Sequence, residues 1–303
     1  MKKTLRIPEL SLRIQKLLKK MNHFIRNCLF AVLAIFFFCL CNHLDEALLE
    51  EPEYEETVLK VASFNTGHFN MGALGGYQGT KVEETLSHWR DWISGQQFDI
   101  LFLQEWNLFF DKNRKYTAQT ELLDPFYEYI FWGDLQDWVL NGICTNLTAR
   151  DAQVKYFHGY YYAVVAYTNF SGKTVALISA HLSRDIHLHK SDIQQFIEFL
   201  GTFDCFVAGG DLNATQEDHL LFKDAGYHIA NGGINGFFKT FPGYDPVSDT
   251  YNNSYADNII TSADIEIRNP FTITTNLNDH DHLPVIAEVV IQSPVKVSTS
   301  ASR

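Results

Sequence analysis

Residues 205–214 read CFVAGGDLNA, and this stretch decides how the rest of the chain is interpreted. An apolar run that favours a buried β-strand ends at Asp211, and Asn213 follows two residues later. Polar residues of this kind often do no more than form a turn or a cap after a strand. The stretch therefore points to a functional site only if other strands of the chain end in the same way.

The same pattern recurs along the chain, because six predicted strands carry a polar residue at or just beyond one end. The strands are expected at 58–64, 98–104, 174–182, 205–210, 258–262 and 284–291. Their polar residues are Asn65, Glu105, His181, Asp211, Asp257 and, before the last strand, Asp281 with His282. Strand ends on one edge of a layered α/β fold converge on a crevice, so we expect these side chains to form one site.

Helical patterns and turn signals separate these strands. Residues 82–93 carry apolar side chains at helical spacing, and so do residues 193–200. A further strand at 161–167 is expected to pair with 174–182 through a short turn. No internal repeat or linker interrupts residues 57–292, so we predict a single α/β domain there.

The N-terminal segment has the composition of a targeting signal. Residues 1–43 hold eight Lys or Arg against one Glu, and an uncharged apolar run of 14 residues spans 28–41. That run is shorter than the ~20 residues of a transmembrane helix but typical of a signal-peptide core. We expect export, with 1–43 acting as a signal peptide or an N-terminal membrane anchor. Residues 44–56 would form an acidic linker and 293–303 a disordered tail.

The charge of the chain limits how it can bind a partner. The formal net charge is −12, and residues 57–303 hold 16 bases against 28 acids. Such an acidic body argues against binding nucleic acid by phosphate neutralisation alone. It fits a protein that recruits a divalent cation.

Cysteines and short motifs exclude other chemistries. Only Cys144 and Cys205 lie beyond the leader. Cys205 lies in an apolar run and is expected to be a buried free thiol, whereas the state of Cys144 stays open. The chain has no Cys/His zinc spacing, no His-Glu-x-x-His and no Gly-x-Ser-x-Gly, so zinc protease and serine hydrolase are poor fits.

The polar strand ends form an ordered set of motifs. They are SFNTG (63–67), LQEW (103–106), SAHLS (179–183), GGDLNA (209–214), ADNII (256–260) and DHLPV (281–285). The set resembles the endonuclease/exonuclease/phosphatase superfamily, the group of deoxyribonuclease I, exonuclease III and the neutral sphingomyelinases. The resemblance spans about residues 58–291. It implies a four-layered α/β sandwich, in which two mixed β-sheets pack face to face with helices outside.

The resemblance and the chemistry of phosphodiester hydrolysis together imply a role for each polar residue. Glu105 is the expected main ligand of a Mg²⁺ or Mn²⁺ ion, steadied by Asn65, and Asp281 would serve a second metal position. Asp211 and Asn213 would orient the attacking water and a phosphoryl oxygen.

Two histidines complete the implied catalytic set. His282 is the candidate base or phosphate-stabilising imidazole, with Asp257 holding its ring. His181 matches family members that use a second histidine at the leaving group or the phosphate. Which histidine is the acid and which the base stays open. His280 offers a second register, but the Leu-Pro-Val that follows His282 places the family motif on Asp281 and His282.

The substrate is a phosphodiester, for which Asn65, Asn213 and Arg184 are the expected binding residues. An exported nuclease is the leading interpretation, and a phosphodiesterase acting on phospholipid or sphingomyelin head groups is the alternative. The position before Asp257 is Ala256, where the apurinic-site repair enzymes of the family carry an arginine. No protein partner is expected, and the chain is expected to be a monomer.

Two groups of side chains outside the motifs are candidates for contact with nucleic acid. Lys112, Arg114 and Lys115 form the one dense basic cluster of the body, although such a cluster is commonly a solvated loop. Phe109, Phe110 and Tyr160–Tyr162 could stack on bases, although aromatics in strand-rich segments are commonly core. A binding module that keeps the fold without catalysis is a third interpretation, which the complete polar set disfavours.

Overall fold

The computed structural model describes residues 54–70, 75–136, 139–170, 172–185, 187–241, 244–245, 250–251, 254–275, 277 and 282–294. All of them belong to one compact unit, Tyr54–Arg303. The expected leader, most of the expected linker, the residues beyond 294 and Asp281 lie outside this set. Within the described ranges, no helix combines the length and the apolar character needed to cross a membrane.

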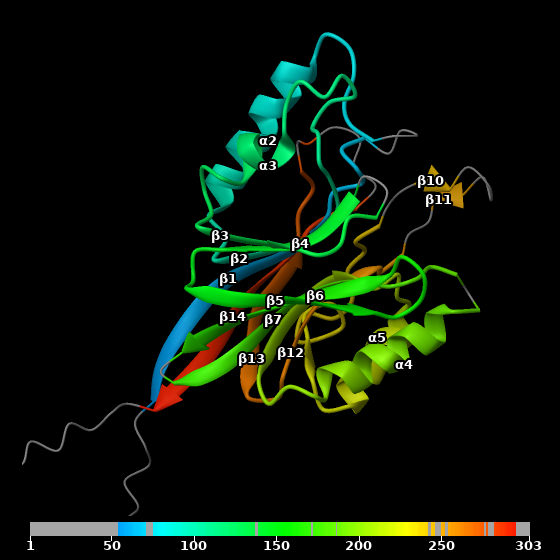
Figure 1. Ribbon diagram of the computed structural model, residues 1–303. Helices are drawn as coiled ribbons and strands as arrows, with labels where there is room; N and C mark the ends of the chain where they lie inside the picture. The colour runs from blue at the N-terminus through cyan, green and yellow to red at the C-terminus, as the bar shows by residue number, and fades with distance from the viewer. Residues whose placement is uncertain are drawn as a thin grey trace, which may run out of the picture. The chain divides into compact units, whose positions relative to one another are not determined.

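The first of two mixed six-stranded sheets has the strand order β13-β14-β1-β2-β4-β3 (Figure 1). Its strands are Tyr54–Asn65 (β1), Ile100–Asn107 (β2), Tyr129–Trp132 (β3), Val139–Thr145 (β4), Ile265–Thr272 (β13) and Val285–Pro294 (β14). Strands β1 and β2 run parallel, and the other neighbours run antiparallel. The parallel pair places the ends of β1 and β2 at one edge of the sheet.

The second sheet has the strand order β5-β6-β7-β8-β12-β9. Its strands are Ala149–Tyr156 (β5), Tyr162–Phe170 (β6), Lys173–His181 (β7), Phe206–Asp211 (β8), His228–Ile229 (β9) and Asp257–Thr261 (β12). Strands β7 and β8 are parallel, and the other neighbours are antiparallel. A separate short hairpin pairs Tyr244–Asp245 (β10) with Thr250–Tyr251 (β11).

Helices cover the outer face of each sheet. They are Val82–Gln96 (α2), Ala118–Leu122 (α3), His189–Leu200 (α4) and Gln216–Asp224 (α5). Figure 1 shows α2 and α3 on one side of the paired sheets and α4 and α5 on the opposite side. The predicted four-layered α/β sandwich is therefore confirmed.

Three apolar clusters fill the spaces between these layers. The central cluster joins the two sheets through side chains such as Val61, Phe102, Val164 and Val207. The second cluster packs α2 and α3 on the first sheet, and the third packs α4 and α5 on the second. Burial of apolar surface on both faces of each sheet is the main stabilising term of such a sandwich.

The helices follow from the apolar spacing that the sequence shows. In α2, Val82, Leu86, Trp89 and Ile93 are all buried, as the period of 3.6 requires. Helix α5 begins with a capping box, in which the Thr215 side chain accepts from the Asp218 backbone and the Asp218 side chain accepts from the Thr215 backbone.

The two glycines before Asp211 allow close approach of other strands. A Cβ atom on Gly209 would lie 2.3 Å from the Phe102 ring of the opposite sheet. A Cβ atom on Gly210 would lie 2.3 Å from the Ala180 carbonyl oxygen of β7. A larger residue at Gly209 would push β8 away from the opposite sheet, and a larger residue at Gly210 would push β8 away from β7.

The pairing of β1 with β14 changes two boundaries that were expected from the sequence, those of the acidic linker and of the C-terminal tail. Residues 54–56 belong to β1 and not to a linker, because they pair with 292–294 of β14. For the same reason, residues 293 and 294 belong to a strand and not to the expected tail.

Cys144 and Cys205 are both buried free thiols, and burial raises the pKa of each.

Candidate active site

Asp211, the last residue of β8, lies at the centre of the polar cluster. Its neighbours in the sheet are His181 of β7 and Asp257 of β12. Its Oδ2 accepts a hydrogen bond from Nδ2 of Asn65 at 2.8 Å. The Nε2 atoms of His181 and His282 lie 3.4 Å and 3.6 Å from the same oxygen. One buried carboxylate oxygen therefore meets side chains from both sheets.

Asp257 and His282 form a buried pair beside Asp211. Nδ1 of His282 lies 2.9 Å from Oδ2 of Asp257, so the contact expected between these residues is present. Burial raises the pKa of Asp257, and the His282 imidazole acts in the opposite direction. The histidine that makes the contact is the one that the Leu-Pro-Val register indicated.

The buried pair of Asp257 and His282 joins the two sheets. The contact itself was expected, but nothing in the sequence assigned the two neighbouring strands to sheets. Strand β12, which Asp257 begins, lies in the second sheet, and β14, which follows His282, lies in the first, so the pair spans the interface between the sheets. The pair therefore depends on how the two sheets pack.

Glu105 projects from an irregularity in β2 rather than from the end of that strand. The register between β2 and β4 shifts between Leu103 and Trp106, so that two residues of β2 oppose the single residue Asn141. Glu105 itself has φ of +50°, a conformation that side-chain-bearing residues seldom adopt. Bulges of this kind redirect a side chain next to active sites. Here the bulge turns Glu105 toward the cluster while β2 continues to Asn107.

The charge of Glu105 is stabilised by imidazoles. Burial alone would raise the pKa of its carboxyl group. The hydrogen bond from His68, together with the charges of His181, His68 and His282, outweighs burial and lowers the pKa to about 2. Glu105 is therefore an ionised carboxylate at neutral pH, which a cation ligand must be.

His68 is a member of the site that the sequence did not indicate. Its Nε2 lies 2.8 Å from Oε2 of Glu105. The loop that carries it leaves β1 after Asn65 and is held by the Glu105 carbonyl oxygen, which accepts from the His68 backbone N–H at 3.1 Å. His68 does not come directly after a predicted strand, and it belongs to no pattern of apolar residues at helix or strand spacing. The only sequence signal was its position three residues after the SFN of the first motif.

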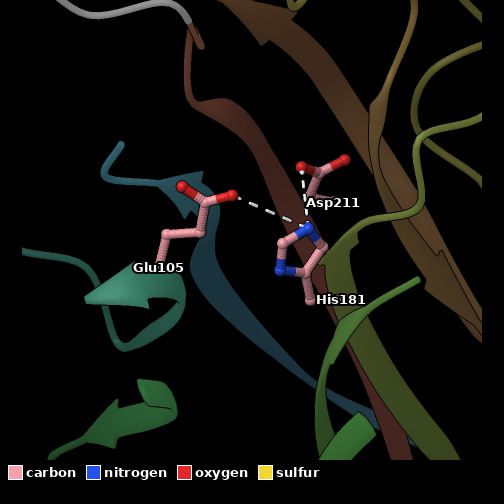
Figure 2. A group of neighbouring side chains, drawn as sticks. All are labelled: Glu105, His181 and Asp211. Carbon is pink, nitrogen blue, oxygen red and sulfur yellow. Dashed lines mark ion pairs between the residues drawn. The ribbon is translucent and has the colours of Figure 1, made fainter. Parts of the chain in front are cut away.

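His181 lies between the two carboxylates. Figure 2 shows its Nε2 directed toward both Glu105 and Asp211. The distances are 3.8 Å to Oε1 of Glu105 and 3.4 Å to Oδ2 of Asp211. The ring of Tyr161 lies edge-on to the imidazole, with centroids 5.3 Å apart. His181 is thus oriented by neighbours on three sides.

The loops after β7 and β8 hold the other expected site residues. Asn213 has φ of +48°, its backbone N–H donates to Oδ1 of Asp211, and its Nδ2 donates to the Leu182 carbonyl oxygen. Arg184 is exposed, and its charge acts on Tyr161, whose pKa is raised chiefly by burial. Asn213 therefore ties the two loops together close to Asp211.

A buried polar link under the cluster connects the sheets. Nε2 of Gln104 in β2 donates to Oγ of Ser179 in β7 at 3.0 Å. The Ser179 hydroxyl in turn donates to the Leu103 carbonyl oxygen at 3.0 Å. These buried groups have partners, so their hydrogen bonds offset the cost of removing them from water, and the link holds β2 against β7 across the interface.

Two groups of side chains have the geometry to hold a metal ion, and they share Asp211. The groups are Glu105, His181 and Asp211, and Asp211, Asp257 and His282, each with ligand atoms within 4.8 Å of one another. The first group offers an ionised, half-buried carboxylate and fits a hard divalent cation. In the second group, Asp257 and His282 already bind each other and are buried.

Asn65 lies beside the first group with its side-chain amide engaged at both ends. Its Oδ1 accepts from the Gly67 backbone N–H at 2.9 Å, and its Nδ2 donates to Asp211. Asn65 is thus in position to steady Asp211. Asp281, the expected ligand of a second metal, lies outside the described residues.

Several side chains that were candidates for nucleic-acid contact are instead packed or paired within the protein. Phe110 is fully buried among the aromatics under α2, and Tyr162 is buried between the sheets, so neither ring can stack on a base. Lys115 donates to Glu83 at 2.7 Å, and Arg114 lies over the Phe109 ring. Tyr160 alone among these aromatics is largely exposed.

Comparison with known proteins identifies the architecture. No family model and no curated protein matches the chain. D. rerio TDP2 complexed with a single-strand DNA product is similar at a TM-score of 0.58 and 14% identity, over 77% of this chain and 99% of that chain. An endonuclease/exonuclease/phosphatase from Bacteroides vulgatus gives 0.59 and 15%, over 77% and 98%.

A third similar structure is a mannosyl-6-phosphatase from Bacteroides thetaiotaomicron, with a TM-score of 0.52 and 15% identity over 76% of this chain and 99% of that chain. These proteins match the present chain along almost their whole length, through both sheets. Sequence identities this low support a shared architecture but not a shared reaction. The chain therefore has the fold of the endonuclease/exonuclease/phosphatase superfamily, as its ordered motifs predicted.

Proposed function

We propose that the protein is a metal-dependent phosphodiester hydrolase. The observation that carries this proposal is the convergence of Glu105, His181, Asp211, Asp257 and His282 from two sheets on one place. Carboxylates beside imidazoles supply the two needs of phosphodiester hydrolysis, a cation ligand and groups that move protons. A binding module would have no chemical need for all five.

The proposed metal ligands are Glu105 and Asp211, with His181 beside them, and the proposed ion is Mg²⁺ or Mn²⁺. When bound, such an ion neutralises charge on the phosphoryl oxygens and lowers the pKa of a bound water. Asn65 holds the Asp211 carboxylate in place. Because Glu105 is ionised at neutral pH, this carboxylate does not have to lose a proton before it binds the cation.

The remaining residues bind and orient the reactants. Asp211 Oδ2 and the Asn213 amide would align the attacking water and a phosphoryl oxygen. Asp257 holds the His282 ring through Nδ1, which leaves Nε2 directed at the cluster. His181 and His282 thus present two Nε2 atoms to the same oxygen, and one of them would protonate the leaving oxygen.

Nucleic acid is the proposed substrate class, with a phospholipid or sphingomyelin head group as the alternative. Among proteins of similar fold, D. rerio TDP2 was captured with a single-strand DNA product, which supports the first choice. The fold also occurs in a mannosyl-6-phosphatase, so the test must include small phosphate esters.

The test is hydrolysis by the purified chain with Mg²⁺ of plasmid DNA, RNA, sphingomyelin and bis-p-nitrophenyl phosphate. Activity on DNA or RNA is expected, and it should disappear in Asp211→Asn. The exposed His187 provides a matched control, because His187→Ala removes an imidazole outside the cluster. Lipid-only activity would select the alternative, and activity on none of the four would overturn the proposal.

We also propose that the chain is exported through its N-terminal segment. The support is the basic flank and the uncharged run at 28–41. N-terminal sequencing of the protein from fractionated cells should find it outside the cytoplasm, either cleaved near residues 39–45 or retained in the membrane. Soluble cytoplasmic protein that still carries residues 1–43 would contradict export.

A further inference from the structure

A pocket opens beside the metal-capable group, and most of the residues that line it have no part in the chemistry proposed above. Its volume is about 240 Å³, and Glu105, His68 and His181 line its inner end. Its outer walls include Tyr160, Tyr161 and Asn141. A group attached to a phosphate at the cluster would therefore point directly into this pocket.

The walls of the pocket are held rigidly. The Tyr162 hydroxyl accepts from the Asn141 backbone N–H at 2.9 Å and donates to the Asp134 carbonyl oxygen at 2.8 Å. Gly133 makes room for the Tyr162 ring, because a Cβ atom there would lie 2.2 Å from it. Tyr161 packs edge-on against His181. Because these walls are already ordered, a ligand that binds there does not have to order them, and less conformational entropy is lost on binding.

The outer part of the pocket offers no basic partner for a phosphate. Among the described residues that line the pocket, none is lysine or arginine, and the one carboxylate is Glu105. The phosphate is therefore expected at the cluster, where the cation is proposed, and the group attached to it in the pocket.

The polar and aromatic groups of the pocket define the occupant further. Tyr160 is 69% exposed at the rim, so a face of its ring is open to a ligand. Gln136 and Asn141 add amide groups that can donate to and accept from hydroxyl or base-edge atoms. An aromatic face with amides beside it suits a flat or cyclic polar group, which stacks on the ring while its edges form hydrogen bonds.

We infer that this pocket is the subsite for the ring-bearing group, a nucleoside or a sugar, that is attached to the scissile phosphate, and that one ring of this group stacks on Tyr160. The inference rests on the phosphoester site proposed above for the position of the phosphate. It goes further by assigning recognition of the attached group to the ring of Tyr160.

The experiment is calorimetric titration of the full chain with Mg²⁺ present. The probes are thymidine 5′-monophosphate, glucose 6-phosphate and inorganic phosphate. At least one of the two ring-bearing monophosphates should bind about tenfold or more tightly than inorganic phosphate. The one that does so distinguishes a nucleoside subsite from a sugar subsite.

Variants assign the effect to the ring of Tyr160. Tyr160→Ala should weaken the ring-bearing probe about tenfold and leave inorganic phosphate within twofold, and Tyr160→Phe should restore binding. Tyr54→Ala is the matched control, because Tyr54 is a 54% exposed tyrosine at the far end of β1. Equal binding of phosphate and both ring-bearing probes, or no effect of Tyr160→Ala, would overturn the inference.

Binding and turnover are scored separately, so that the two proposals fail in different ways. Products are analysed after each titration and in the hydrolysis assay described above. A chain that binds the ring through Tyr160 but hydrolyses nothing would overturn the proposed function and keep the subsite. A chain that hydrolyses phosphodiesters with no dependence on Tyr160 would keep the function and overturn the subsite.

Discussion

The two ends of the polar cluster are built in different ways. At one end, Asp257 and His282 are buried, leave regular strands and bind each other across the sheet interface. At the other end, Glu105 and His68 are partly exposed, have φ of +50° and +55°, and line an open pocket. The buried end is suited to holding a proton-transfer group in one orientation, and the open end to admitting a cation and a substrate.

Removal of the metal should have the largest effect and should act at the open end. EDTA is expected to abolish hydrolysis and Mg²⁺ to restore it, because the open end supplies the hard-cation ligands. Glu105→Gln should lower kcat about 10²-fold or more while the protein keeps its circular dichroism spectrum. Undiminished turnover in EDTA would show that the open end is not a metal site.

Loss of the buried imidazole should come next in size. His282→Ala should cost the ~10²–10⁴-fold in kcat that is typical of a general acid–base group. Asp257→Asn should cost much of the same factor, because the ring stays but loses the carboxylate that orients it. Steady-state rates of both variants at saturating Mg²⁺ provide the measurement.

The double variant tests whether the buried end acts as one unit. Asp257→Asn with His282→Ala should be barely slower than His282→Ala alone, since residues that act together are not additive. If the factors by which the two substitutions lower the rate multiply instead, Asp257 and His282 act independently and the buried end is not one unit.

A smaller effect is expected from His68, which contacts Glu105 rather than the reacting atoms. His68→Ala should raise the Mg²⁺ concentration for half-maximal rate by about 10–100-fold, as loss of an outer partner of a metal ligand does. At saturating Mg²⁺ its kcat should return to near the wild-type value, whereas that of Glu105→Gln should not. His187→Ala should change neither quantity, and a loss of kcat that Mg²⁺ cannot restore would place His68 in the chemistry itself.

The same contrast explains what the sequence could predict. Asp211 and His181 end continuous apolar runs that are visible in the sequence, so their place at one sheet edge followed directly. The ordered motifs predicted the layers. Sequence order does not state which strands pair, however, so it could not show that the Asp257–His282 contact lies between two sheets.

The open end was less predictable for a different reason. The bulge that redirects Glu105 and the backbone turn that brings His68 to it both arise from positive φ values at residues other than glycine. Tertiary contacts impose such conformations, and no local pattern of residue types signals them. Tyr160 and Tyr162 have identical side chains two residues apart, and only the packing shows that one is open and the other buried.

The smallest predicted effect concerns His189, the first residue of α4, which contacts the loop after β7. His189 donates from Nδ1 to the Ser183 carbonyl oxygen and from Nε2 to Asp218, which requires both ring nitrogens to carry protons. The Asp218 hydrogen bond is the largest of the contributions that raise the pKa of His189. The stabilisation is therefore fully present below about pH 6.5, the unfolded pKa, and is lost as the pH rises through the folded pKa.

Urea unfolding between pH 6 and 8.5 measures this effect. The free energy of unfolding should fall by about 1 kcal/mol across that range. His189→Ala should remove most of the decrease, and His187→Ala should not. A wild-type protein whose stability rises over the same range would contradict the pairing.

Strands β1 and β14 have a consequence for how the protein can be handled. Tyr54 begins β1 opposite Pro294 at the end of β14, so the chain enters and leaves the sheet side by side. From Tyr54 to Asn65, β1 advances eleven residues at about 3.3 Å each, so the two paired strand ends lie about 36 Å along β1 from Asn65. A tag, a fused partner or a solid support joined at either position is held clear of the active site. A short loop from 294 back to 54 would close the domain into a circular permutant, with new ends opened elsewhere on the surface.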